Sequence, residues 1–430
     1  MSFDLINKRV TVIGAARSGV AVANAVVRLG GIAKISENKE LEGFNAQLKE
    51  LDDPSRVSIE AGGHTKAFIQ DSDYVILSPG VRLDMLSVKW ARDAGAEVMG
   101  EVEFAFRLCP CPIIAITGSN GKTTTSTVIA EIIKRAGRQV CLCGNIGSPL
   151  SKHVVDLKPA DMVVLEISSF QLESTIHFKP HVAVWTNFSQ NHLDRHKDLA
   201  EYFQAKAKIF ANQDANDFAV LNYLDEEHKK LAGGLKAKVL FFNQDHPHLA
   251  SPIKGEGLMV DNPNYLAAMQ AVRALGIGED ICLKVFSEFK GVEHRLEYVR
   301  QLDGVDYIND SKSTTIEASR WALERANKPV VMICGGSDKK LDYIPLKSLV
   351  AQKVKHMIAI GQIRDIIRST FDDVVKVDLA ANLKEAVLIA RTIARPGECV
   401  LLSPMTASFD MFKDYEDRGR VFKEIIGNLK

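Results

Sequence analysis

The stretch Ala115-Ile-Thr-Gly-Ser-Asn-Gly-Lys-Thr-Thr-Thr125 joins a strand-like apolar run to a helical pattern through a short turn that contains two glycines. In the general phosphate-loop pattern G-x-x-x-x-G-K-[ST], the first glycine would stand at Ile116. Strand, turn and helix still follow in the order that directs backbone N–H groups at phosphate oxygens. We therefore predict a nucleotide-binding loop at 118–124, with Lys122 on the terminal phosphates and Thr123 on Mg²⁺. A purely structural turn is the alternative, but it needs no Lys-Thr pair.

The chain divides into three α/β blocks, and this stretch opens the second. β-Branched runs alternate with helical patterns, which is typical of mainly parallel sheets with crossover helices. At roughly 100–200 residues per domain, 430 residues allow three domains. We predict an α/β fold with a Rossmann-like domain at 1–102, a central P-loop ATPase-like domain with a mainly parallel sheet at 103–292, and a Rossmann-like domain at 293–430. The expected strands are 9–14, 32–36, 74–80, 113–117, 162–167, 182–186, 218–221, 298–301, 305–308, 330–334, 357–360 and 399–403, with helices at 19–29, from the loop to about 136, and at 316–326.

The composition excludes several classes of protein. The 54 basic and 54 acidic residues leave a net charge of zero, which does not favour a nucleic-acid partner. No apolar run approaches the length of about 20 residues that spans a bilayer. The first ten residues lack a signal-peptide pattern. We therefore expect a soluble cytoplasmic protein with no membrane partner.

The seven cysteines include two C-x-C pairs, Cys109/Cys111 and Cys141/Cys143. Zinc sites usually use C-x₂₋₄-C with further ligands at matched spacing. Pro110 and Pro112 bracket the second thiol of the first pair. We expect reduced thiols here rather than a metal site.

Polar residues of the second block are candidates for metal binding. Glu166 ends a predicted strand, where carboxylates commonly hold Mg²⁺, although an exposed strand-end carboxylate has the same pattern. His192 and His196 are spaced i,i+4 and would share one face of a helix, with solvated histidines as the alternative. Lys206 and Lys208 lie in a segment whose default interpretation is an amphipathic helix with solvated lysines.

In the first block, Gly14-Ala-Ala-Arg-Ser-Gly19 follows the first predicted strand and has the form G-x-A-x-x-G. Ala16 replaces the glycine that admits a pyrophosphate closely, and Glu37 ends the next strand where a ribose-binding acid belongs. A redox dinucleotide is therefore the weaker interpretation, and a looser nucleotide-binding turn is favoured. Ser78-Pro-Gly80 ends another strand of this block.

In the third block, Asp310, Lys312 and Thr314 form a dense polar cluster after a strand, and helix capping explains one of them but not all three. Asp303-Gly304 lies between two strands and predicts a hairpin turn. The segment 402–419 leads from a strand end into a polar and aromatic loop, which is either a ligand site or a connector.

Taken in order, these motifs resemble the Mur ligase family over the whole chain. The shared motifs are Gly118-Ser-Asn-Gly-Lys-Thr-Thr124, Asn145-Ile-Gly147, Glu166, His192 and His294-Arg295. Those most similar to the branch that adds D-glutamate are Ile167-Ser-Ser-Phe-Gln-Leu172, Asn309-Asp-Ser-Lys312 and Ser403-Pro…Ser408-x-Asp410…Phe412. The positions that depart from the family pattern are Asn191, Pro263, Ala267 and Thr315.

The resemblance implies that the three domains bind a UDP-sugar, ATP and an amino acid in turn. The implied ATP-binding residues are Gly118, Ser119, Asn120, Gly121, Lys122, Thr123, Thr124, Asn264, Arg295 and Asp310. The implied residues for the UDP substrate are Gly14, Ala15, Ala16, Arg17, Ser18, Glu37, Ser78, Pro79, Gly80, Asn145 and His192. Those for the amino acid are Lys312, Thr314, Lys339, Ser408 and Tyr415.

The resemblance also implies a catalytic set that consists of Lys122, Glu166, His192 and Lys206. Two Mg²⁺ ions would be held by Thr123, Glu166, His192 and a CO₂-derived carbamate on Lys206. A neutral lysine amine can capture CO₂ and so become an oxygen-bearing anion suited to Mg²⁺. Lys208 is two residues away, but the register of the apolar residues favours Lys206.

The implied activity is an ATP-dependent amide ligase that joins UDP-N-acetylmuramoyl-L-alanine and D-glutamate in peptidoglycan precursor synthesis. A carboxylate oxygen attacks the γ-phosphate of ATP, and the amino-acid amine then attacks the resulting acyl phosphate. A sibling ligase that adds another amino acid is one alternative. A catalytically silent nucleotide-binding regulator is the other, although it has no need for a complete metal set. We expect a monomer whose partners are these small molecules.

Overall fold

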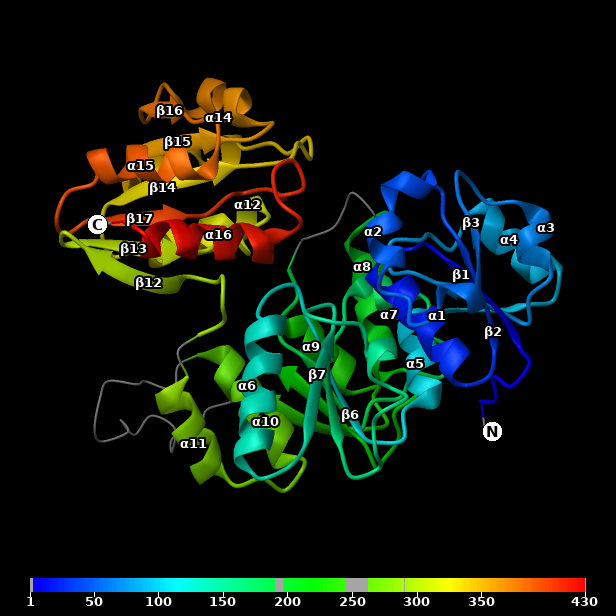
Figure 1. Cartoon of the computed structure of the whole chain (residues 1–430). Helices are drawn as coiled ribbons and strands as arrows, with labels where there is room; N and C mark the ends of the chain where they lie inside the picture. The colour runs from blue at the N-terminus through cyan, green and yellow to red at the C-terminus, as the bar shows by residue number, and fades with distance from the viewer. Residues whose placement is uncertain (1–2, 190–195, 244–261, 290, 430) are drawn as a thin grey trace. The chain divides into compact units, whose positions relative to one another are not determined.

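The computed structural model describes residues 3–189, 196–243, 262–289 and 291–429. It contains three sheets, two in the unit Met1–Phe289 and one in the unit Lys290–Lys430 (Figure 1). Parallel strands alternate with helices in both units, which confirms the predicted α/β class. No described helix has both the length and the apolar composition needed to cross a bilayer.

The first sheet has the strand order β3-β2-β1-β4-β5 and is parallel throughout. Its strands are β1 (Arg9–Ile13), β2 (Ile32–Ser36), β3 (Val57–Glu60), β4 (Tyr74–Leu77) and β5 (Glu97–Gly100). Its helices are α1 (Arg17–Arg28), α2 (Asn45–Leu48), α3 (Lys66–Gln70), α4 (Leu86–Asp93) and α5 (Glu101–Leu108). Helices α1 and α5 contribute to one apolar core, while α3 and α4 contribute to another. Because both faces are covered, most residues of the central strands β1 and β4 are buried.

The second sheet has the order β11-β10-β9-β6-β8-β7 and is also parallel. Its strands are β6 (Ile113–Thr117), β7 (Val140–Gly144), β8 (Met162–Glu166), β9 (Val182–Trp185), β10 (Phe218–Asn222) and β11 (Lys238–Phe242). The helices around it are α6 (Lys122–Arg135), α7 (Ser169–Glu173), α8 (Leu199–Ala207), α9 (Glu226–Ala232), α10 (Pro263–Arg273) and α11 (Glu279–Glu288).

Strand β6 lies inside this sheet and buries both of its faces. Ile114 and Ile116 pack in the same core as α6, α10 and α11, whereas Ile113 and Ala115 pack in the core on the opposite side. This alternation follows the two-residue period of a strand. Because β6 is parallel to its neighbours β8 and β9, the carboxyl ends of all three strands open on one edge of the sheet.

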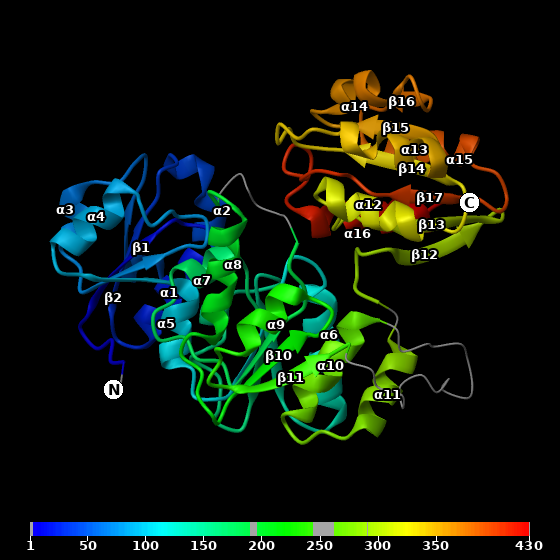
Figure 2. The same ribbon diagram turned by 180° about the vertical axis from the view of Figure 1, so that it is seen from behind.

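The third sheet has the order β12-β13-β17-β14-β15-β16, with only β12 antiparallel to its neighbour. Its strands are β12 (Glu297–Leu302), β13 (Val305–Asn309), β14 (Val330–Gly335), β15 (Val354–Ile360), β16 (Val377–Leu379) and β17 (Cys399–Leu402). Its helices are α12 (Ile316–Arg325), α13 (Lys347–Lys353), α14 (Arg364–Phe371), α15 (Leu383–Ile393) and α16 (Tyr415–Gly427), seen from behind in Figure 2. One core contains α12, α13 and α14, and a separate core contains α15 and α16.

Two local predictions for this unit have different outcomes. The hairpin turn is confirmed, because Asp303 and Gly304 join β12 to β13 with φ of 52° and 76°, the positive values that a type I′ turn requires. The idea that capping explains one of Asp310, Lys312 and Thr314 is wrong. The cap of α12 is Thr315, whose side chain accepts a hydrogen bond from the N–H of Ala318.

A buried carboxylate fastens the helix that leads from the first sheet toward the second. Glu103 of α5 is fully buried and accepts hydrogen bonds from the N–H groups of Ile176, His177 and Phe178 at 2.9–3.0 Å. Its carboxylate also pairs with Arg107 at 2.8 Å. These bonds tie α5 to the segment that precedes β9.

We predict that Glu103→Gln lowers the free energy of unfolding by about 3 kcal/mol. The neutral amide cannot balance the positive charge of Arg107, and its NH₂ group would face backbone N–H groups that also donate. Glu97→Gln is the matched control, since Glu97 also pairs with Arg107, at 2.7 Å, but is 43% exposed. It should cost less than about 1 kcal/mol. The measurement is urea unfolding of the full-length protein. Equal midpoints for the two variants would contradict the role of Glu103.

Candidate active site

The predicted phosphate loop lies between β6 and α6. Gly118 has φ of 151°, and Gly121 caps α6 in the left-handed region with φ of 80°. A Cβ atom at Gly118 would come within 1.9 Å of Thr186 Oγ1, and one at Gly121 within 2.1 Å of Asn264 Oδ1. Both positions therefore require glycine, and Asn264 lies against the loop.

The residues that follow β9 hold this loop in place. The N–H groups of Ser119 and Asn120 donate to the backbone oxygen of Asn187 at 3.0 Å and to its side-chain oxygen at 2.9 Å. Thr186 Oγ1 donates to the carbonyl of Asn120 at 2.6 Å. The loop conformation thus depends on a strand about 65 residues further along the chain.

Lys122, at the start of α6, extends back over the loop. Its ammonium donates to the carbonyls of Gly118 at 2.9 Å and Ser119 at 3.2 Å. Thr123 is buried and Thr124 half-buried in the first turn of the same helix. A lysine in this position can move from the loop carbonyls to phosphate oxygens that arrive at the same place.

Lys206 is buried beside the loop, on α8. Its side chain is 1% exposed, and its Nζ donates to the carbonyl of Gly118 at 2.9 Å and lies 4.7 Å from the centre of the Tyr202 ring. Burial, and then the nearby charge of Lys122, hold the pKa of Lys206 well below its usual value. The default expectation of a solvated lysine is therefore wrong for Lys206.

The side chain of Lys208 points away from the loop that Lys206 contacts. Its ammonium donates to the carbonyls of Glu173 at 2.6 Å and Thr175 at 3.2 Å. The loop therefore contacts the first of the two lysines, in agreement with the register of the apolar residues.

Glu166, at the end of β8, carries the carboxylate of the site. Its Oε1 accepts a hydrogen bond from the side-chain amide of Asn145 at 2.8 Å, while its buried Oε2 has no hydrogen-bond partner among the described residues. An unpaired buried carboxylate oxygen is costly unless a cation compensates it. Oxygen ligands of this kind suit Mg²⁺, so this donor set fits the ion that the sequence predicts.

The predicted metal ligand His192 lies in 190–195, outside the described residues, as does Asn191. His196 is described and is buried, with its Nε2 3.0 Å from Ser169 Oγ and its ring stacked on Phe170. It precedes α8 rather than lying on a helix, so helical i,i+4 geometry does not apply to it.

The predicted turn for the UDP substrate lies at the carboxyl end of β1. Gly14 has φ of 98°, and its carbonyl accepts a hydrogen bond from Ser78 Oγ at 3.0 Å. The carboxylate of Glu37 accepts the N–H of Ala15 at 2.7 Å. The other predicted residues of this group are Ala16, which precedes α1, Ser18 within α1, and Pro79 and Gly80, which follow β4.

Arg17 connects this turn to the second sheet. Its guanidinium donates to the carbonyl of Gly147 at 3.1 Å, two residues beyond Asn145. Asn145 in turn contacts Glu166 through its side chain and through its N–H, which donates to the Glu166 carbonyl at 2.8 Å. The first unit thus contains a continuous path from the predicted UDP turn to the predicted metal carboxylate.

The residues predicted to contact the amino acid all lie in the second unit, on segments that follow strands β13, β14 and β17, with Tyr415 at the start of α16. Lys312 Nζ lies 3.3 Å from the hydroxyl of Tyr415 and 5.2 Å from the centre of its ring. Ser408 is buried, and its carbonyl accepts the N–H groups of Met411 and Phe412. The remaining two are Thr314, which is half-buried, and Lys339, which is exposed.

The two predicted ATP-binding residues of this unit lie close together. Asp310 is buried and accepts hydrogen bonds from Ser313 Oγ at 2.5 Å and Ser403 Oγ at 3.0 Å. Burial raises its pKa to about 6, against the opposing charge of Arg295. The Nε of Arg295 is buried without a hydrogen-bond partner in the described structure, which suits a guanidinium that awaits an anion.

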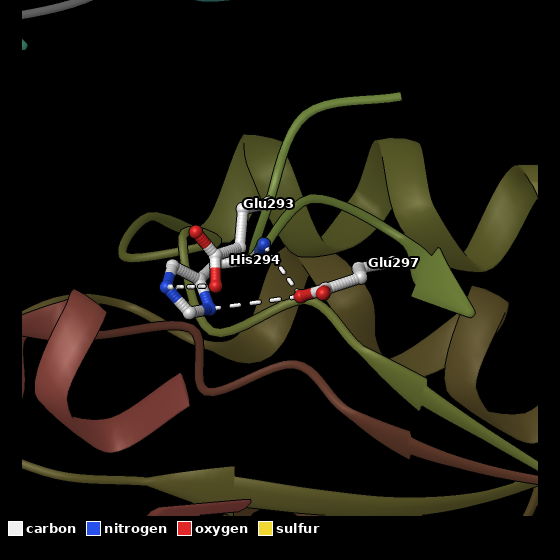
Figure 3. Close-up of side chains that lie close together, drawn as sticks. All are labelled: Glu293, His294 and Glu297. Carbon is white, nitrogen blue, oxygen red and sulfur yellow. Dashed lines mark hydrogen bonds and ion pairs between the residues drawn. The ribbon is translucent and has the colours of Figure 1, made fainter. Parts of the chain in front are cut away.

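Glu293, His294 and Glu297 converge before and at the start of β12, with their ligand atoms within 4.8 Å of one another (Figure 3). The ammonium of Lys423 already bridges both carboxylates, at 2.9 Å from Glu297 Oε1. Asn309 also donates to Glu297 at 2.9 Å. This cluster is therefore a compensated ion-pair network and not our candidate metal centre.

The chain matches known proteins along its whole length. Residues 8–100 match the MurD-like N-terminal domain of Mur ligases, and residues 116–259 match the Mur ligase middle domain. The chain is 39% identical to the UDP-N-acetylmuramoylalanine–D-glutamate ligase of Pelotomaculum thermopropionicum, with 99% of both chains covered. It is 38% identical to the ligase of the same name from Caldanaerobacter subterraneus, with 99% of this chain and 100% of that one covered. The chain belongs to the Mur ligase family.

Solved structures of other Mur ligases share the fold. The UDP-N-acetylmuramate-alanine ligase of Thermotoga maritima superimposes with a TM-score of 0.61 at 19% identity, over 98% of this chain and 100% of that one. The pseudomurein peptide ligase type C of Methanothermus fervidus gives 0.57 at 18% identity, over 99% and 100%. At such identities the similarity establishes the architecture alone.

Sequence reasoning missed several residues that shape the site of this Mur ligase. Thr186 and Asn187 fix the phosphate loop, and Tyr202 packs on Lys206 with its hydroxyl 3.3 Å from Ser119 Oγ. Their position after β9 and one turn before Lys206 could have revealed them. Arg418 had no such signal, because it is one charged residue among several on α16.

Arg418 is nevertheless 1% exposed and joins three segments of the second unit. Its guanidinium donates to Ser311 O at 2.9 Å, Thr406 O at 3.3 Å and Gly335 O at 3.4 Å. Burial lowers its pKa to about 9. The loops that follow β13 and β17 are therefore fixed to each other and to the end of β14.

We predict that Gly118→Ala weakens MgATP binding about tenfold or more, which corresponds to about 1.4 kcal/mol, because the new methyl group displaces Thr186 and with it the loop. Gly137→Ala is the control for backbone strain alone, since Gly137 also has a positive φ, of 79°, but nothing lies within 4 Å of its Cβ position. Isothermal titration calorimetry measures both affinities. An unchanged affinity in Gly118→Ala would refute the role of the loop.

Proposed function

We propose that this Mur ligase joins UDP-N-acetylmuramoyl-L-alanine to D-glutamate at the expense of ATP, as a UDP-N-acetylmuramoylalanine–D-glutamate ligase of peptidoglycan precursor synthesis. The full-length relatives that carry this name support the choice of substrates. The observation that carries the chemistry is the buried site at Gly118, where the Lys122 and Lys206 amines meet within electrostatic reach of Glu166.

The proposed division of labour follows the three sheets. Residues 1–102 would bind the UDP group at Gly14–Ser18, Glu37 and 78–80, and residues 103–292 would bind ATP at the phosphate loop and Asn264. Residues 293–430 would bring the amino acid. The path from Arg17 through Gly147 and Asn145 to Glu166 supports a substrate that extends from the first sheet to the second.

The first chemical step needs neutralisation of phosphate charge. Lys122 would move from the loop carbonyls onto the β- and γ-phosphates, which favours in-line attack by the substrate carboxylate. Thr123, Glu166, His192 and modified Lys206 would hold two Mg²⁺ ions, which when bound polarise the phosphoryl oxygens. Asn145 and His192 would orient the acyl end of the UDP substrate.

The environment of Lys206 supports the proposed carbamate. Because burial lowers the pKa of Lys206, it favours the neutral amine, which retains the lone pair that attacks CO₂. The amine nitrogen forms a bond to the carbon of CO₂ and loses one proton, which converts a base into an anion. That anion would place a second oxygen ligand beside Glu166.

The second step needs a bound amino acid whose amine is free to attack the acyl phosphate. Lys312, Thr314, Lys339, Ser408 and Tyr415 would bind D-glutamate, because ammonium and hydroxyl donors suit a dicarboxylate. Arg295 would contact the ATP phosphates and Asp310 the ribose. Cytoplasmic location and a monomeric state complete the proposal, with small molecules as the only partners.

The assay that tests the function supplies UDP-N-acetylmuramoyl-L-alanine, MgATP and one amino acid at a time, and measures phosphate release and the ligated product. We predict turnover with D-glutamate only. Turnover with another amino acid instead would identify a sibling ligase. Absence of turnover across UDP-muramoyl acceptors and amino acids would favour the regulator.

We predict that Lys206→Ala abolishes turnover and that short carboxylates such as formate or acetate restore part of it, because they replace the carbamate oxygens. Lys208→Ala is the matched control, since that lysine lies two residues away and bonds to carbonyls outside the site. It should retain activity within about tenfold of the native protein. An active Lys206→Ala variant, or one that no carboxylate rescues, would count against the carbamate.

A further inference from the structure

Cys109 and Cys111 bring two thiols together on the segment between α5 and β6. Their Sγ atoms are 3.7 Å apart, and the thiol of Cys109 donates to the carbonyl of Cys111 at 3.5 Å. For comparison, two sulfurs bound to one tetrahedral zinc at about 2.3 Å lie about 3.8 Å from each other. The thiols are therefore already spaced for attachment to a single central atom.

The backbone maintains this spacing. Pro110 separates the two cysteines and Pro112 follows them, so each cysteine precedes a proline and is restricted to extended conformations. Cys109 has φ of −73° and ψ of 119°, as this restriction requires. Because the segment is stiff before any ligand binds, bridging the thiols sacrifices little conformational freedom.

One of the two thiols is accessible to solvent, and burial favours the protonated form of both. Cys109 is half-buried and reachable from solvent, whereas Cys111 is 8% exposed. Burial raises the pKa of Cys109, and it raises that of Cys111 to about 12. Oxidation by peroxide or by another disulfide requires a thiolate, so both thiols react slowly along that route. Condensation with a hydroxyl group on arsenic(III) releases each thiol proton in a water molecule, so the bound product needs no net ionisation of the thiols.

The number of available ligands decides between the candidate central atoms. A structural zinc ion takes four protein ligands. Among the described residues, Glu293, His294 and Glu297 are the only group of three or more histidine, cysteine or acidic side chains whose ligand atoms lie within 4.8 Å of one another. Cys109 and Cys111 thus offer two sulfurs and no third ligand. An organic arsenic(III) centre, which already carries one carbon, needs two.

We propose that Cys109 and Cys111 form a binding site for trivalent organic arsenicals. Two As–S bonds replace two As–OH bonds, each thiol proton leaves in a water molecule, and no electrons are transferred. The product is a ring that contains arsenic, both sulfurs and the backbone of residues 109–111. The site lies outside the proposed catalytic residues, so it does not depend on the proposed function.

The second C-x-C pair provides the matched comparison. Cys141 and Cys143 lie on strand β7, where residues two apart are separated by about 6.6 Å along the chain, and Cys143 is fully buried. Their thiols influence each other, since Cys143 lowers the pKa of Cys141. Because Cys143 is fully buried, an arsenical cannot reach both sulfurs from solvent, so this pair should not react.

The test treats the full-length protein with phenylarsine oxide and measures the intact mass and the number of thiols that remain open to maleimide. We expect one phenylarsenic group per chain, two protected thiols, and full release by 2,3-dimercaptopropanol. Cys109→Ser and Cys111→Ser should each lose the adduct, while the double variant Cys141→Ser/Cys143→Ser should keep it.

Three results would overturn the proposal: no adduct on the native protein, an adduct that persists in Cys109→Ser, or an adduct lost in the Cys141/Cys143 double variant. Circular dichroism melting of each variant establishes that the fold is retained. If either serine variant fails to fold, Cys109→Ala or Cys111→Ala replaces it, because a small apolar side chain suits the same packing.

Discussion

The architecture of the site depends on the close approach of β9 to the phosphate loop at Gly118. Any side chain at this position would occupy the space of the Thr186 hydroxyl, 1.9 Å from the Cβ position. Because Gly118 leaves room for the residues after β9, Thr186 and Asn187 form hydrogen bonds with the loop. The Gly118 carbonyl is then left pointing at both Lys122 and Lys206. The absence of a side chain at Gly118 therefore determines where the amines of Lys122 and Lys206 come together.

Several electrostatically unfavourable groups lie around the Gly118 carbonyl. Two lysines share one carbonyl, Lys206 is held away from water, and one oxygen of Glu166 is buried without a described partner. Such groups are costly in an isolated protein, and perturbed ionisation of this kind clusters at functional sites. Phosphates and divalent cations would compensate both signs of charge at once. This explains physically why the first unit maintains so unfavourable an arrangement.

The strands that sequence patterns missed have one feature in common. β3, β5, β7, β11 and β16 were not expected, and each lies at an edge of its sheet. A central strand in a doubly covered sheet is apolar on both faces and is easily recognised, whereas an edge strand is short or partly exposed and its pattern is weaker. All other strands were expected, with ends that agree within a few residues. Of the edge strands, only β12 was recognised, because the Asp303-Gly304 turn marks its end.

For the candidate site too, some features follow from the sequence and others only from the tertiary structure. The order of residues alone determined the α/β class, the phosphate loop, the carboxylate at the end of β8 and the family, because these depend on local periodicity and on motifs that are continuous in the chain. Only the tertiary structure decided that Lys206 is buried while Lys208 turns to other carbonyls, and that Arg418 joins the loops after β13 and β17 to the end of β14. These outcomes depend on contacts between segments tens to about a hundred residues apart, and burial, which lowers the pKa of Lys206, exists only once those segments have packed.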